Sequence, residues 1–242
     1  MKLIHKLSLV AGALSVLVAS SCNTKKEIWK SEGKVKVVAT TTMAADLVRQ
    51  IGGDKVEVYG LMDEGTNPHS YEGKPTDTVA TSTADVVVYS GLHLEHKLAE
   101  MLEKMEKAVA VTSGMPKDQL IFPKEEVSQY ADPHVWGDPT LWTHGVQPVV
   151  DALSKANAEN AAYYKKRGEE YVKELAQLHA WSQKRLSEIP EEHRVLVTSH
   201  DAFMYFSKAY NLEVRAIDGL SPDDKAGPMK VKQLIKFIKD RK

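Results

Sequence analysis

Short apolar runs alternate with amphipathic stretches along this chain from residue 34 onward. Runs rich in β-branched residues predict four strands, over about 35–39, 55–61, 85–89 and 108–112. Apolar residues spaced three and four apart predict helices between them, over about 43–51, 75–83 and 94–105. Strands that alternate with helices in this way predict an α/β fold, with a mostly parallel sheet covered by helices on both faces.

The second half of the chain has longer helical patterns. A helix over about 140–156 precedes a proline-free stretch, Asn157 to Ile189, whose apolar residues keep helical spacing. At 1.5 Å per residue this stretch predicts a helix about 50 Å long, a stiff spacer between two lobes. Beyond it we expect two strands and two helices, over about 194–198, 202–210, 213–217 and 231–238. Because two strands are marginal for an independent lobe, we expect the second lobe to be incomplete and the chain to be cut short.

The N-terminus has the features of an export signal. An uncharged run from Leu7 to Ser20 follows a lysine-containing start; it is too short to span a bilayer comfortably but suits a signal peptide. Cys22, the only cysteine, comes directly afterwards and cannot form an internal disulfide. The spacing of Ala19-Ser20-Ser21-Cys22 resembles the lipobox of bacterial lipoproteins, so we predict a signal peptide over 1–21 and a polar tether over 22–33 that is lipidated at Cys22. An incidental cysteine near an ordinary cleavage site is the alternative.

Composition and charge narrow the classes of function. The chain of 242 residues is 43% hydrophobic and 27% charged, which is ordinary for a folded protein. The formal net charge is −1 and the 32 basic residues are dispersed, so nucleic acid is not an expected partner. The sequence contains no Cys-x-x-Cys, His-Glu-x-x-His or Gly-x-Ser-x-Gly motif, and this weakens an enzymatic function without excluding it.

Three histidines in short, turn-like contexts carry the most specific chemical prediction. They are His69, His134 and His200, each at the edge of a predicted strand or helix. Neutral imidazoles that converge from separate loops suit a metal ion such as Zn²⁺. Asp132 and Asp201 are predicted to accept hydrogen bonds from these imidazoles, although a helix N-terminal acid explains Asp201 equally well. Isolated surface histidines are the alternative for all three.

Three further hypotheses remain open at this point. His93 and His96 lie three residues apart on a predicted helix, a spacing that suits a metal pair, but an exposed polar helix face also explains them. Three histidine ligands with a fourth position open to solvent would suit a zinc-dependent hydrolase that activates water. A surface adhesin is another hypothesis, because an exposed lipoprotein fits that function.

Several segments, taken in order, carry a resemblance to a known family. They are Thr40-Thr41-Thr42, Asn67-Pro68-His69-Ser70-Tyr71-Glu72, Ser90-Gly91-Leu92-His93-Leu94-Glu95, Asp132-Pro133-His134-Val135-Trp136 and Arg194 to Phe203. In this combination the chain resembles the zinc- and manganese-binding solute-binding lipoproteins of bacterial metal ABC importers, the TroA-type family. The resemblance covers nearly everything from residue 34 onward.

The resemblance implies two α/β lobes joined by one long backbone helix. The corresponding regions here are a first lobe over 34–156, a linking helix over 157–190 and a partial second lobe over 191–242. It further implies an exported monomer that is anchored through a lipid on Cys22 and faces the periplasm or cell surface. Such a protein captures Zn²⁺ or Mn²⁺ and passes it to a membrane permease, without catalysing a reaction.

The resemblance also implies roles for individual residues. His69 and His134 match the two metal ligands of the first lobe, and His200 matches the third ligand, from the second lobe. A histidine at this third position points to the zinc type or a mixed zinc and manganese type. The family's fourth ligand, an aspartate from a later loop, has no match here. Residues 115–131 contain no histidine, unlike the His-rich loop of many zinc members, so manganese remains open.

Overall fold

The computed structural model describes residues 28–123 and 130–241. The chain divides into two units, Met1–Lys30 and Ser31–Lys242, and the second unit contains all the elements described below. The predicted signal peptide and Cys22 lie outside the described residues. Within the described ranges, no helix is both long enough and apolar enough to cross a membrane.

A four-stranded parallel sheet forms the centre of the first lobe, with the strand order β2-β1-β3-β4. Its strands are β1 (Val35–Ala39), β2 (Val56–Gly60), β3 (Val86–Tyr89) and β4 (Ala108–Ala110). The two central strands, β1 and β3, are valine-rich and largely buried, as expected where helices cover both faces of a parallel sheet. The structure therefore confirms the parallel sheet that the sequence predicts.

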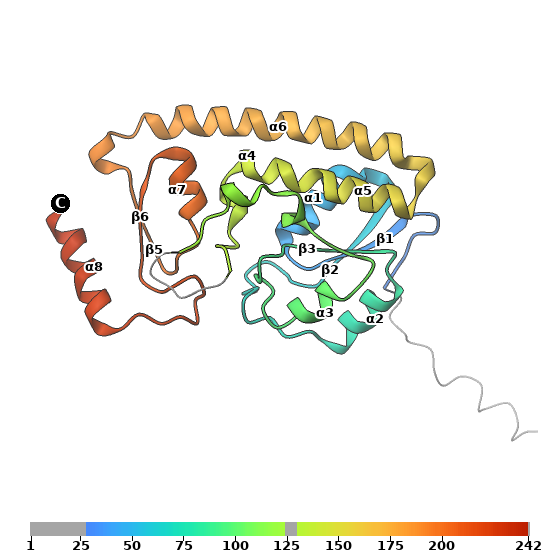
Figure 1. The fold of residues 1–242 in the computed structure, drawn as a ribbon, viewed down its shortest axis with the longest axis horizontal. Helices are drawn as coiled ribbons and strands as arrows, with labels where there is room; N and C mark the ends of the chain where they lie inside the picture. Colours follow the sequence, from blue (N-terminus) through green and yellow to red (C-terminus); the bar gives the residue numbers. More distant parts are fainter. Residues whose placement is uncertain (1–27, 124–129, 242) are drawn as a thin grey trace, which may run out of the picture. The chain divides into compact units, whose positions relative to one another are not determined.

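Helices cover the two faces of this sheet (Figure 1). One face carries α1 (Thr42–Gly52) and α5 (Val146–Ala156), and the other carries α2 (Pro75–Thr83) and α3 (Ala99–Glu103). The Thr41 side chain caps α1 by accepting a hydrogen bond from the Ala44 amide at 3.1 Å. The cap begins α1 at Thr42, only three residues after β1 ends at Ala39. The connection from β1 is therefore short and leaves room for other loops at the carboxyl edge of the sheet.

The long helix α6 (Ala161–Ser187) has 27 residues and is about 40 Å long. It packs on α1 and α5 and continues until it reaches α7 of the second lobe (Figure 1). Gly168 allows close packing, because a Cβ atom there would lie 2.9 Å from Cγ2 of Val150 on α5. The helix is shorter than the predicted 157–189 because a 3₁₀ turn, Ala158–Asn160, precedes it.

The second lobe contains a two-stranded parallel sheet of β5 (Val195–Thr198) and β6 (Glu213–Ala216). Helix α7 (Met204–Tyr210) connects these strands, and α8 (Pro228–Asp240) follows β6. Asn211 ends α7 with a left-handed backbone (φ 53°), which lets the chain turn back into β6.

The structure corrects two predicted helices. The helix predicted over 94–105 is reduced to α3, and His93 precedes it in a turn, where its φ of 61° is incompatible with a right-handed helix. The helix predicted over 140–156 is divided into α4 (Pro139–Trp142), a 3₁₀ turn and α5. Pro148 has no N–H and cannot donate to the His144 carbonyl, so a continuous helix would lose a hydrogen bond here.

Candidate metal centre

His69 lies in the loop that connects β2 to α2, beyond the carboxyl end of β2. The Asn67 side chain accepts a hydrogen bond from the His69 amide at 3.0 Å and so forms a local turn. The loop is held further by buried Tyr71, whose hydroxyl lies 2.6 Å from Oδ2 of Asp77 at the start of α2. These contacts hold the half-buried imidazole of His69 in place.

His134 is the most deeply buried of the three predicted ligands, with 2% of its surface exposed. Asp132, which is fully buried, lies beneath it: its Oδ1 accepts a hydrogen bond from the His134 amide at 2.9 Å and lies 2.7 Å from His134 Nδ1. A carboxylate can only accept, so Nδ1 carries the proton and Nε2 has a free lone pair. Asp132 is therefore in position to orient this imidazole, and its role at a metal site stays a prediction.

His200 comes from the second lobe, directly after the carboxyl end of β5. Thr198 Oγ1 donates to the His200 carbonyl at 2.9 Å, and the Asp201 amide donates to the carbonyl of Gly219 at 2.9 Å. The turn is thus tied to the loop that follows β6. The contact at Asp201 involves its backbone, and a role of its carboxylate in orienting an imidazole stays a prediction.

The structure brings these three histidines together from two lobes. One nitrogen from each lies within 4.8 Å of the other two, and Nε2 of His69 is 3.2 Å from Nε2 of His134. The ring centroids are 5.2 Å apart for His69 and His134, 5.5 Å for His134 and His200, and 6.1 Å for His69 and His200. Two nitrogens bound tetrahedrally to one Zn²⁺ lie about 3.3 Å apart, so the spacing of the first pair suits a shared metal ion.

Burial and mutual repulsion lower the pKa of two of these imidazoles, those of His69 and His200. Burial, and then the neighbouring His134 and His200, lower the pKa of His69 from 6.5 to about 4. The pKa of His200 is also lowered, by burial and then by His134. Neutral imidazole is the form that binds a metal ion, so at neutral pH His69 and His200 need no deprotonation before binding.

The histidines line a cavity of about 510 Å³ between the lobes. Apolar side chains, Met43, Trp136 and Phe203 among them, form part of its wall. Within the described residues, the cluster of ligand atoms contains the three histidines and no carboxylate. The geometry therefore presents three nitrogen donors, and no described residue takes the place of the aspartate that the resemblance implies.

Tyr205 is a residue that supports the site and that sequence reasoning missed. It is 1% exposed and extends from α7 of the second lobe into the first, where its hydroxyl donates to the Asp132 carbonyl at 2.9 Å and accepts from the Ile121 amide at 3.0 Å. Burial raises its pKa to about 12. In the sequence it is one of several aromatic residues of an amphipathic helix, with no signal that separates it from the core.

The chain is similar to proteins that bind and transport metals. A family model described as zinc-uptake complex component A, periplasmic (ZnuA), matches residues 37–242. The manganese-binding lipoprotein MntA of Bacillus subtilis (strain 168) is 37% identical over 236 residues, which cover 96% of this chain and 76% of the relative. The zinc-binding protein TroA of Treponema pallidum (strain Nichols) is 37% identical over 215 residues, covering 88% and 69%.

The fold agrees with these similarities. The solved structure of the periplasmic zinc-binding protein TroA from Treponema pallidum superposes with a TM-score of 0.81 at 37% identity, covering 86% of this chain and 76% of that one. The long helix and parallel sheets of the present structure therefore represent a shared architecture. From the family match and the two relatives together, this chain belongs to the ZnuA family of metal-uptake solute-binding proteins.

Proposed function

We propose that this protein is the extracytoplasmic substrate-binding component of a metal ABC importer. It captures a divalent transition-metal ion between its lobes through His69, His134 and His200, and delivers the ion to a membrane permease. The metal is cargo, and the protein catalyses no reaction. Its family of solute-binding transport proteins favours this function over a zinc-dependent hydrolase.

The observation that carries the proposal is the spacing of the imidazole nitrogens. The 3.2 Å between Nε2 of His69 and Nε2 of His134 suits two ligands of one ion. Asp132 fixes the tautomer of His134 that leaves Nε2 available. Three imidazole nitrogens from two lobes thus converge on one point, as the ligands of a shared ion do.

The donor set favours Zn²⁺ over Mn²⁺ as the tighter ligand. Imidazole suits zinc, whereas manganese prefers carboxylate, carbonyl and water oxygens, and the intrinsic affinity of nitrogen sites is lowest for Mn²⁺. The two relatives, at equal identity, are named for manganese and for zinc respectively. We therefore propose that this chain binds both ions and holds zinc more tightly.

We further propose that a lipid on Cys22 anchors a monomeric protein at the outer face of the cytoplasmic membrane. The position of Cys22 after an uncharged run supports this, as does the description of MntA as a lipoprotein. Residues 22–33 would then tether the folded unit near the permease. Mass spectrometry of the membrane fraction tests it, because Cys22→Ala should release the protein and remove the lipid mass.

Zinc competition with a chromophoric chelator tests the metal site. His134→Ala should weaken zinc binding by more than about a hundredfold, because it removes a buried ligand and leaves Asp132 without its partner. His193→Ala is the matched control, since His193 is exposed in a 3₁₀ turn outside the cluster, and it should bind as the wild type does. If His134→Ala keeps wild-type affinity, the assignment of the site is wrong.

A further inference from the structure

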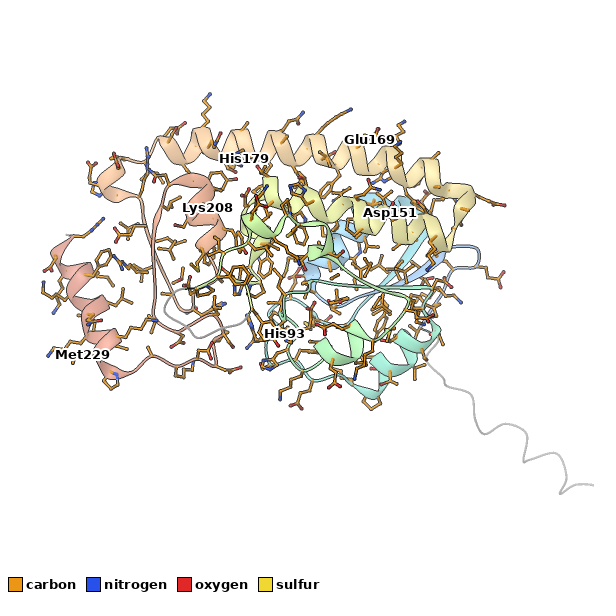
Figure 2. The ribbon with its side chains drawn as sticks, viewed as in Figure 1. His93, Asp151, Glu169, His179, Lys208 and Met229 are labelled. Carbon is orange, nitrogen blue, oxygen red and sulfur yellow. The ribbon has the colours of Figure 1, made fainter. Side chains whose placement is uncertain are left out.

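His69 lies where two cavities adjoin. It lines the cavity of about 510 Å³ that contains the metal centre and also a second cavity of about 480 Å³. Both lobes form the walls of the second cavity, which include His93 of the first lobe (Figure 2) and part of the loop between β6 and α8. His134 and His200 line only the cavity of the metal centre. His69 is therefore the ligand that an ion can reach through either cavity.

The charged side chains on these walls are mostly carboxylates. Asp63, which is exposed in the loop between β2 and α2, lines the cavity of the metal centre, and no lysine or arginine among the described residues does so. Asp223 and Asp224, also exposed, line the second cavity. Lys97 lines it too, but its ammonium pairs with Glu72, which lies outside the lining. The surroundings of the first ligand thus carry three carboxylates and one paired ammonium.

Hydrogen bonds hold the acidic loop of the second lobe beside the metal centre. Oδ2 of Asp224 accepts from the Ser221 amide at 2.9 Å, and its carbonyl accepts from the Gly219 amide at 2.9 Å. The Gly219 carbonyl in turn accepts from the amide of Asp201, in the turn that carries the third histidine. Pro222 of the same loop lines the cavity of the metal centre. The charges of this loop therefore keep a defined position near the ligands.

The imidazoles respond to these charges. Burial and the other two histidines lower the pKa of His69 to about 4, and the carboxylates of Asp224 and Asp223 act against this lowering. Burial is also the main cause that lowers the pKa of His200, and Asp218, in the same acidic loop, acts against it. A carboxylate that favours a proton on an imidazole also favours a metal ion at that place, because both are cations.

We propose that Asp63, Asp223 and Asp224 form a negatively charged entrance that attracts divalent cations towards His69. These carboxylates act before coordination and are not ligands, because the ligand atoms that come together among the described residues belong to the three histidines. Charges of one sign along a cleft with low-dielectric walls raise the local concentration of counter-ions and accelerate association by about 10- to 1000-fold. This inference rests on the proposed function, since it concerns how the captured ion reaches the metal centre.

Stopped-flow measurement of zinc uptake from a weak chromophoric indicator gives the association rate. At low ionic strength, Asp223→Asn/Asp224→Asn should slow association by about three- to tenfold, because two charges are lost while each asparagine keeps an acceptor oxygen. Asp63→Asn, in the first lobe, should slow it by a smaller factor and decides the matter if the double variant does not fold. Glu191→Gln/Glu192→Gln is the matched control: it removes two exposed charges outside both cavities and should associate as the wild type does.

Ionic strength separates charge attraction from damage to the site. Salt at about 0.5 M reduces the range of charge interactions to a few ångströms, so the wild type and the aspartate variants should converge on one rate. Aspartate variants that associate as fast as the wild type at low salt would overturn the proposal, and so would variants that stay equally slow at high salt. A wild type that takes up no zinc would instead reject the metal centre, and with it the proposed function.

Discussion

Replacing Asp132 with asparagine separates the chemistry of the metal site from the stability of the fold. Oδ1 of Asp132 contacts both the amide and Nδ1 of His134, while its other oxygen, Oδ2, is buried without a hydrogen-bond partner among the described residues. Asparagine keeps an acceptor oxygen for both contacts. It removes the negative charge behind the imidazole. In the wild type this charge makes Nε2 a stronger donor to a metal ion.

The expected loss of zinc affinity follows from this arrangement. Changes to a partner behind a histidine ligand cost about 10- to 100-fold in metal affinity, or about 1.4–2.7 kcal/mol. The metal-free protein should change far less. The asparagine N–H₂ group takes the place of Oδ2, an oxygen that already lacks a hydrogen-bond partner. The cost of burying this N–H₂ group is offset because the variant no longer buries a charge. The free energy of unfolding should therefore change by less than about 1 kcal/mol.

Two assays on the same variants check this reasoning. Competition with a chelator measures zinc affinity, and urea denaturation of the metal-free protein measures the free energy of unfolding. Asp132→Ala is the contrasting variant: it strips both His134 donors of their acceptor and should destabilise the fold by about 1–3 kcal/mol as well as weaken binding. Zinc affinity of Asp132→Asn within about twofold of the wild type would refute a role for the charge.

Three further predictions concern the lobes and their packing. Tyr205→Phe removes the hydroxyl that bonds two backbone groups near His134 and should lower the free energy of unfolding by about 1–3 kcal/mol in urea titrations. The pKa of His69 is about 4 in the folded protein and 6.5 for a free imidazole, so the unfolded state takes up the proton first as the pH falls. The urea midpoint of the metal-free protein should therefore fall as the pH drops from about 6.5 towards 4. Gly168→Ala places a Cβ 2.9 Å from Val150 and, despite better helix propensity, should destabilise by about 1–2 kcal/mol in thermal unfolding.

Features that depend on the local pattern of apolar and polar residues, such as the strands of the first lobe, could be predicted from the sequence. Valine-rich runs and helical spacing identify the parallel sheet of the first lobe, because burial on both faces leaves a continuous apolar run. The three histidines could be grouped because two of them follow strands, and the loops beyond the carboxyl ends of parallel strands lie along one edge. Their convergence to within 4.8 Å depends on the second lobe docking against the first, which no local pattern records.

The errors come from interactions between distant residues. Leucines and methionines at helical spacing over 94–105 predict a helix, but buried Glu95 accepts a hydrogen bond from Thr40, 55 residues away along the chain, as well as from the Ser90 and Gly91 amides, and so stabilises a turn in its place. Tyr205 bonds Asp132, 73 residues away along the chain. Neither interaction leaves a periodic signal, since each depends on where the chain returns in space. Such contacts fix the site, and only the structure places them.

The arrangement of the ligands also indicates how small a movement would release the metal under the proposed function. His69 and His134 belong to one lobe and His200 to the other, so only His200 changes its distance when the lobes shift. The α6 helix and the Tyr205 contacts join the lobes and oppose a wide swing. Zinc–nitrogen bonds have a narrow length of about 2.0–2.1 Å, so a shift of roughly 1 Å breaks the third bond. Because Asp201 ties the His200 turn to Gly219, a permease that displaces the loop after β6 would pull this ligand away without bending α6.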